Sequence, residues 1–91
     1  MERMNDIECK SWCVYLILCE DGSYYAGVTN DLEARFATHL SGKGAKYTRA
    51  HKPLRVIAFR RYEDRAAAQK AEWAVKQLPK RKKIAFLASG D

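Results

Sequence analysis

Arg35 and His39 are the first residues whose types and spacing suggest chemistry. They are four positions apart in a stretch predicted to be helical, so both side chains lie on one edge of the helix. This edge is beside an apolar stripe in which Leu32, Phe36 and Leu40 repeat every four residues. A guanidinium and an imidazole at the edge of a core can bind an anion and exchange a proton. Each also has a simpler interpretation: Arg35 pairs with Asp31 one turn earlier, and His39 is a partly buried polar residue.

Glu72 is the third candidate, because it is the only carboxylate between Asp64 and Asp91. It falls in a predicted helix, at the border of the apolar side, within a half of the chain that is otherwise strongly basic. The alternative is an ordinary ion pair with Lys76 at i+4.

Tyr15 and Tyr25 lie on a predicted β-hairpin, and its turn decides whether they share a face. A two-residue turn at Asp21 and Gly22 would place them on opposite faces, because side chains alternate along a strand. A three-residue loop ending at a left-handed Gly22 pairs Tyr15 with Gly27 instead, and both tyrosines then become diagonal neighbours on one face. We predict the three-residue loop, in which Gly27 leaves space for a ligand or for a tilted ring.

The elements that must position these residues follow from hydrophobic periodicity and from turn and capping signals. Asn30, with Glu33 three residues later, predicts the start of the first helix, and Asp64 predicts the start of the second. The predicted elements are strands at residues 12–19, 24–28 and 54–60, a basic loop at 41–53, and helices at 31–40, 65–78 and 80–87. This β-β-α-β-α-α order predicts an α/β domain of the α+β type: a three-stranded antiparallel sheet with the first strand central, flanked by helices.

The 91 residues fit one domain, which we place at residues 12–88 behind a flexible N-terminal segment of residues 1–11. The longest apolar run is too short to span a bilayer, and the first ten residues lack the apolar core of a secretory signal. We therefore expect a cytoplasmic protein with no membrane partner. The three cysteines, Cys9, Cys13 and Cys19, have no zinc-site spacing and are predicted to be buried thiols.

Charge is divided unevenly along the chain. The net charge is +6 overall, but residues 1–40 carry −4 whereas residues 41–83 carry +11. A basic half of this kind favours a polyanionic partner, because each neutralised phosphate releases condensed counterions. The alternative is a basic surface that serves solubility alone.

Two short motifs resemble the paired signature of the GIY-YIG nuclease superfamily. The resemblance covers most of the chain and includes an arginine eight residues beyond the second motif and a glutamate on a later helix. The matching residues are Cys13-Val14-Tyr15, Tyr25-Ala26-Gly27, Arg35 and Glu72. The Gly-Lys-Gly-Ala-Lys-Tyr-Thr-Arg loop at residues 42–49 further resembles the small, single-domain bacterial GIY-YIG proteins.

This resemblance implies hydrolysis of a nucleic-acid phosphodiester with one divalent metal ion. Glu72 would hold Mg²⁺ or Mn²⁺, and Arg35 would bind the phosphate oxygens on which charge grows. Tyr25 would orient or deprotonate the attacking water, with Tyr15 and His39 as its hydrogen-bonding partners. Whether Tyr25 or His39 takes the proton stays open.

The implied substrate is DNA rather than RNA, in repair or in the processing of structured DNA. Many superfamily members carry a late asparagine, whereas the only asparagines here are Asn5 and Asn30. The alternative is therefore a nucleic-acid-binding module with the same fold and little or no cleavage. Because the domain is small, a protein partner can supply specificity; the oligomeric state is open.

The basic loop is the predicted nucleic-acid contact. Its cations would grip backbone phosphates, and its aromatic residue would stack on an unpaired base. The candidates are Lys43, Lys46, Tyr47, Arg49 and Lys52, with His51 interleaved. The run at residues 80–83 either extends this track or is a solvated helix end.

Overall fold

The computed structural model describes residues 11–88. The predicted N-terminal segment, apart from Ser11, and Cys9 with it, lies outside the described residues. The described elements are β1 (Cys13–Cys19), β2 (Tyr24–Thr29), α2 (Leu32–Leu40), α3 (Lys46–Ala50), β3 (Pro53–Arg61), α4 (Arg65–Gln77) and α5 (Lys80–Ala88).

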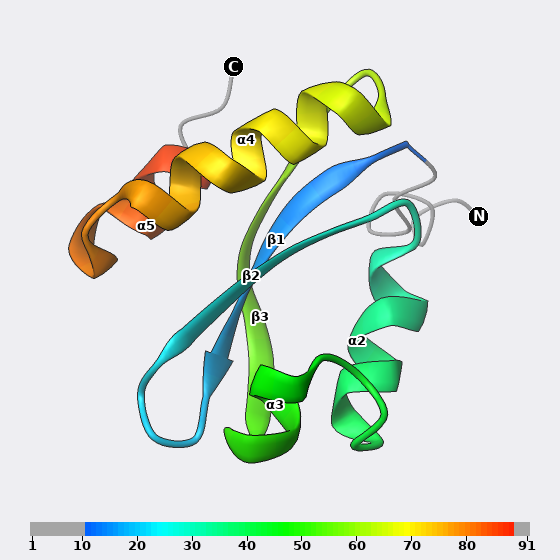
Figure 1. The fold of residues 1–91 in the computed structure, drawn as a ribbon, viewed down its shortest axis with the longest axis vertical. Coiled ribbons are helices and arrows are strands. Elements are labelled where there is room, and N and C mark those ends of the chain that lie inside the picture. The colour runs from blue at the N-terminus through cyan, green and yellow to red at the C-terminus, as the bar shows by residue number, and fades with distance from the viewer. Residues whose placement is uncertain (1–10, 89–91) are drawn as a thin grey trace.

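The three strands form one antiparallel sheet in the order β2-β1-β3, as predicted. The first strand is central because residues 13–17 are apolar at every position and all five are buried. Helices cover both faces of this strand, with α4 and α5 on one side of the sheet and α2 and α3 on the other (Figure 1).

Alternate side chains of β1 therefore enter two separate cores. Val14 and Leu16 pack with Ala68 and Val75 of α4. Tyr15 and Ile17, one residue out of phase with them, pack on the other face with Leu32 of α2 as a close neighbour. Tyr15, the residue of β1 proposed for chemistry, thus faces the α2 side of the sheet.

The β1–β2 hairpin has the predicted three-residue loop. The amide of Cys19 donates to the carbonyl of Ser23 at 2.8 Å, and Gly22 adopts the left-handed conformation with φ of 87°. Tyr15 pairs with Gly27, as this loop length requires. Both signature tyrosines consequently lie on one face of the sheet.

The first helix differs from the prediction in two details. Its N-cap is Asp31 rather than Asn30: the Asp31 side chain accepts from the amide of Ala34, while the Asp31 amide donates to the Thr29 hydroxyl. Its inward face carries His39, which is buried, whereas Leu40 is 54% exposed.

The basic segment at residues 41–53 is not a plain loop. It contains the five-residue helix α3, whose N-cap Ala45 offers no side-chain hydrogen bond. Helix α3 begins four residues after a left-handed Gly42 with φ of 84° and packs near the hairpin (Figure 1).

Cys13 and Cys19 are buried free thiols, as predicted. None of the helices within residues 11–88 is both long enough and apolar enough to cross a membrane.

Candidate active site

Tyr15 lies on the central strand, and its ring extends over the neighbouring strand. Its partner across the ladder is Gly27 of β2, and Tyr15 is only 1% exposed. A methyl group at position 27 would overlap the Tyr15 hydroxyl and lie 2.5 Å from its Cζ. Gly27 therefore makes room for a tilted ring, one of its two predicted uses, and the ring carries the hydroxyl toward the edge of the sheet.

His39 binds Tyr15 with one ring nitrogen and Thr48 with the other. The Tyr15 hydroxyl is 3.0 Å from Nε2 of His39, and Nδ1 is 2.7 Å from Oγ1 of Thr48. The Thr48 hydroxyl donates its hydrogen to the carbonyl of Ala45 at 3.0 Å, so its oxygen accepts from Nδ1 of the imidazole. In neutral His39 the proton is therefore on Nδ1, and Tyr15 donates to the lone pair of Nε2.

These three side chains form a buried hydrogen-bonded chain, because Tyr15, His39 and Thr48 are each at most 2% exposed. Gly44 makes this packing possible: a side chain there would collide with the imidazole of His39, its Cβ lying 2.9 Å from Cγ.

Arg35 acts on both members of the Tyr15–His39 pair. Burial raises the pKa of Tyr15 to about 12; interaction with Arg35 opposes this rise, while negative charge on Tyr25 and Glu72 adds to it. Burial, followed by the positive charge of Arg35, lowers the pKa of His39. At neutral pH Tyr15 is therefore a phenol and His39 is a neutral imidazole.

Tyr25 is the partly exposed ring of this group, and it contacts the other two. Its ring centroid is 6.4 Å from that of Tyr15 and 5.3 Å from that of His39. On another side it stacks with Tyr47 of α3 at 5.7 Å, and Tyr47 stacks in turn with His51 at 4.1 Å.

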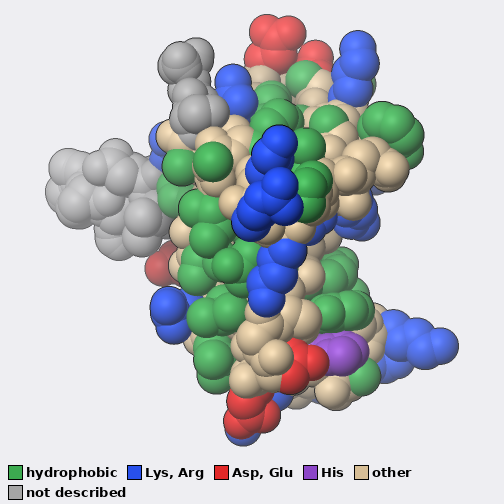
Figure 2. Space-filling model, turned by 90° about the vertical axis from the view of Figure 1, so that its left-hand side faces the viewer, with side chains coloured by type: hydrophobic (Ala, Val, Ile, Leu, Met, Phe, Trp, Pro, Cys, Tyr) green, Lys and Arg blue, Asp and Glu red, His purple; other side chains and the backbone are tan. Residues whose placement is uncertain are grey.

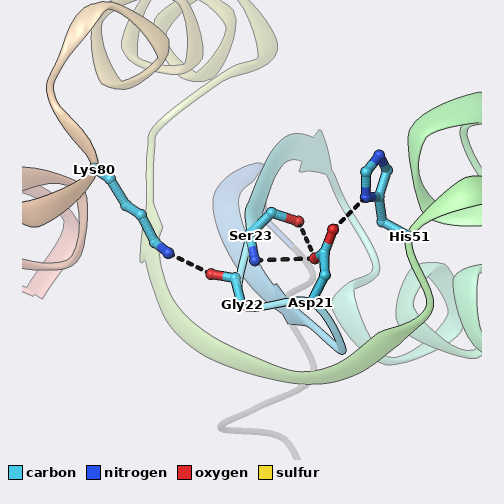
Figure 3. Close-up of polar contacts among 5 residues, drawn as sticks. All are labelled: Asp21, Gly22, Ser23, His51 and Lys80. Atoms are coloured by element: carbon cyan, nitrogen blue, oxygen red, sulfur yellow. Dashed lines mark hydrogen bonds and ion pairs between the residues drawn. The ribbon is translucent and has the colours of Figure 1, made fainter.

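This aromatic column ends on the hairpin turn. Nδ1 of His51 is 2.6 Å from Oδ2 of Asp21, and the other oxygen of Asp21 accepts from the amide and hydroxyl of Ser23 (Figure 3). The hydrogen bonds from Ser23, followed by that from His51, hold the pKa of Asp21 well below its usual range. On the other side of the turn, Lys80 of α5 donates to the carbonyl of Gly22 (Figure 3).

Glu72 approaches from α4, on the opposite side of the sheet. Its Oε2 is 3.0 Å from Nζ of Lys76, so the i+4 ion pair considered as the simpler interpretation is present. Glu72 is nevertheless close enough for its charge to act on Tyr15. The structure thus brings four of the candidate catalytic residues together, Tyr15, Tyr25, Arg35 and His39. Glu72 lies on α4 and is linked to them only by the effect of its charge on Tyr15.

This site offers one carboxylate, that of Glu72, to a divalent metal ion. Within residues 11–88, no three His, Cys, Asp or Glu side chains are grouped so that they could hold a metal ion. The Glu72 carboxylate, whose side chain is 25% exposed, is a hard oxygen donor. Mg²⁺ commonly keeps several waters and takes one or two carboxylates together with substrate phosphate, so a single carboxylate is compatible with it.

The predicted nucleic-acid residues surround α3. The four cations Lys43, Lys46, Arg49 and Lys52 are exposed. Tyr47 is also partly exposed, but its ring is already stacked with Tyr25 and His51, so it forms part of the site wall.

Three residues that contribute to the site were not predicted from the sequence: Thr48, Gly44 and Asp21. Thr48 orients His39, Gly44 admits the imidazole, and Asp21 holds His51. The glycines on both sides of Lys43 were the available signal, because they permit a close approach of backbone to side chain.

Comparison with known proteins identifies the class. A family model described as the GIY-YIG catalytic domain matches residues 11–85. The chain therefore belongs to the GIY-YIG catalytic domain family.

Within this class the chain is similar to small bacterial proteins called UPF0213. One from Xanthomonas campestris is 59% identical over 78 residues, which cover 86% of this chain and 76% of that protein. Another, from Cupriavidus pinatubonensis, is 48% identical over 79 residues, covering 87% and 88% of the two chains.

Two solution NMR structures are also similar. The UPF0213 protein of Bacillus halodurans is 41% identical, with a TM-score of 0.52 and coverage of 86% of this chain and 83% of that one. A protein of E. faecalis is 41% identical, with a TM-score of 0.60 and coverage of 88% and 85%.

Proposed function

We propose that this protein is a metal-dependent nuclease that hydrolyses phosphodiester bonds of DNA, in repair or in the processing of structured DNA. The observation that carries the proposal is the buried Tyr15–His39 hydrogen bond, with Arg35 and Glu72 acting on the same hydroxyl and Tyr25 beside it. Membership of the GIY-YIG family supports nuclease chemistry, and the basic half of the chain supports a nucleic-acid substrate.

Tyr25 is the group that meets the attacking water, because it is partly exposed while Tyr15 and His39 are buried. Tyr15 does not act as a free base, since its pKa is raised to about 12. Its hydroxyl instead donates to Nε2 of His39, which makes this imidazole nitrogen the acceptor for the Tyr15 proton.

Arg35 binds the non-bridging oxygens of the scissile phosphate. A guanidinium offers several donors in a fixed plane and suits charge that develops on phosphate oxygens. Glu72 would hold Mg²⁺ or Mn²⁺, which when bound would supply Lewis-acid stabilisation of the phosphate and of the leaving oxygen. Lys76 must then release the Glu72 carboxylate.

The test is cleavage of single-stranded, duplex and branched DNA by the pure protein, with Mg²⁺, with Mn²⁺ and with chelator. We expect metal-dependent cleavage that falls by roughly 10²–10³-fold in Arg35→Gln and at least as far in Glu72→Gln. The matched control is Glu63→Gln, an exposed carboxylate before α4, which should cleave normally.

Cleavage that survives in both Arg35→Gln and Glu72→Gln would point to a contaminating enzyme. Binding without cleavage in either metal would favour the alternative, a nucleic-acid-binding module. Comparison of circular and linear substrates then assigns endonuclease or exonuclease action.

A further inference from the structure

A small pocket crosses the edge of the sheet at β2, next to the candidate site. Its cavity volume is about 250 Å³. It is lined by side chains from both faces of the hairpin and from three helices: Leu16, Tyr24, Tyr25, Ala26, Tyr47, Lys76 and Lys83. On the molecular face that carries α5 and the hairpin, Lys and Arg side chains form a band with hydrophobic side chains on both sides (Figure 2).

One side of this pocket is aromatic and apolar. Leu16 and Ala26 are buried core residues that close its base. The tyrosines are held in place: Tyr25 stacks with Tyr47, and Nζ of Lys80 lies 4.6 Å from the ring centroid of Tyr24. Fixed aromatic rings bind unpaired bases in a sequence-tolerant way, because every base has a flat apolar face.

The other side of the pocket is cationic. Nζ of Lys83 donates to the carbonyl of Val75 at 2.8 Å, which anchors its charge at the end of α4. The side chain of Lys76 is 49% exposed and forms an ion pair with Glu72. Because Lys76 and Tyr25 both line the pocket, the pocket lies between Tyr25 and the candidate metal ligand Glu72. In a nucleic acid, the group that two such ammonium groups next to an aromatic wall would bind is a backbone phosphate.

We propose that this pocket is a subsite for one unpaired nucleotide next to the scissile phosphate, with the base against Tyr24 and Tyr25 and the phosphate between Lys76 and Lys83. The proposal rests on the proposed nuclease function for the position of the scissile bond. At 250 Å³ the pocket is smaller than the ~300–1,000 Å³ typical of drug-sized ligands, so it has room for one base, with the phosphate at its rim, and excludes a base pair. The preferred substrate is therefore single-stranded or locally unpaired at the cleavage position.

The test is binding of a short oligonucleotide that carries the fluorescent base analogue 2-aminopurine, in chelator so that no cleavage occurs. We expect single strands to bind about tenfold more tightly than the matching duplex, with quenching of the analogue as it packs against Tyr24 and Tyr25. Lys76→Gln should weaken binding by about three- to tenfold and reduce the salt slope by about 0.7, the value for one lost phosphate contact on a single strand. Lys76→Arg should retain binding.

The matched control is Lys70→Gln, which removes the same charge about 120° away around the axis of α4 and should bind within about twofold of the parent protein. Equal or tighter binding of duplex, or equal effects of Lys76→Gln and Lys70→Gln, would overturn the subsite. Subsite binding without cleavage in any metal would overturn the nuclease and leave the subsite intact. Normal cleavage, with no difference in binding between the two lysine variants, would overturn the subsite and leave the nuclease function intact.

Discussion

Thr48 decides which nitrogen of His39 is available to Tyr15. Its hydroxyl is committed to the carbonyl of Ala45, so it can only accept from Nδ1, and Nε2 is left with its lone pair toward the tyrosine. A buried residue on α3 thus sets the direction of the hydrogen bond in the centre of the site.

We expect Thr48→Val to disturb both stability and catalysis. The imidazole N–H would lose its buried partner, which costs about 1–3 kcal/mol of unfolding free energy. His39 would also gain access to the other tautomer, in which Nε2 carries hydrogen and cannot accept from Tyr15. The ¹⁵N shifts of the imidazole should report this change, and the cleavage rate should fall.

Thr48→Ser is the control for this prediction, because it retains the hydroxyl. It should keep the parent tautomer and most of the cleavage rate. An unchanged imidazole spectrum in Thr48→Val would show that Thr48 does not set the tautomer.

His39 also predicts how stability depends on pH. Its folded-state pKa is lowered by burial and by Arg35, so below its ordinary value of about 6.5 the unfolded chain binds a proton that the folded chain does not. The free energy of unfolding should therefore decrease as the pH falls from about 6.5 toward the folded-state pKa. Urea unfolding at several pH values measures this slope, and His39→Gln should flatten it.

At the scale of elements, the hairpin places both tyrosines on one face through a single glycine. Gly22 has φ of 87°, and no atom lies within 4 Å of a Cβ added there, so a substitution would meet backbone strain alone. Gly22→Ala should cost about 1–2 kcal/mol of unfolding free energy in denaturant titration. Gly22→Asn should cost less, because asparagine tolerates the left-handed region better; a loss equal to that of alanine would contradict this explanation.

The hairpin was predictable because strand alternation allows only two outcomes, and only one of them joins the tyrosines. The sheet order followed from the uninterrupted apolar run of β1, which needs cover on both faces. In each case a local pattern leaves only two possible arrangements, and residues close by in the sequence decide between the two.

Other details depend on contacts distant in sequence. Periodicity favoured Leu40 as an inward residue, whereas His39 is buried because Tyr15 and Thr48 satisfy both of its nitrogens. Asn30 and Asp31 are equally good caps, and the Thr29 hydroxyl favours the second by binding its amide. Helix α3 has neither a capping side chain nor an apolar repeat, so no local sequence pattern predicted it.

At the scale of the whole molecule, the acidic first half supplies the hairpin turn and the basic second half surrounds the site. Six cations can contact phosphate: the four exposed cations around α3, together with Arg35 and Lys76. If all six do so, the logarithm of single-strand affinity should fall with the logarithm of the salt concentration at a slope of about −4. Titrations between about 50 and 200 mM salt measure this slope. A peptide nucleic acid of the same sequence, which has no phosphates, should show almost none; a near-zero slope with DNA would contradict phosphate recognition.

Helix α3 is five residues long, far below the roughly 12–15 residues at which an isolated helix becomes even marginally stable in water. Its order therefore comes from the side-chain contacts that Tyr47, Thr48 and His51 make with the hairpin and with α2. Opening of α3 and loss of the His39 tautomer are then one local event, which requires less free energy than global unfolding. Hydrogen exchange at the α3 amides consequently measures the fraction of molecules that hold a competent site.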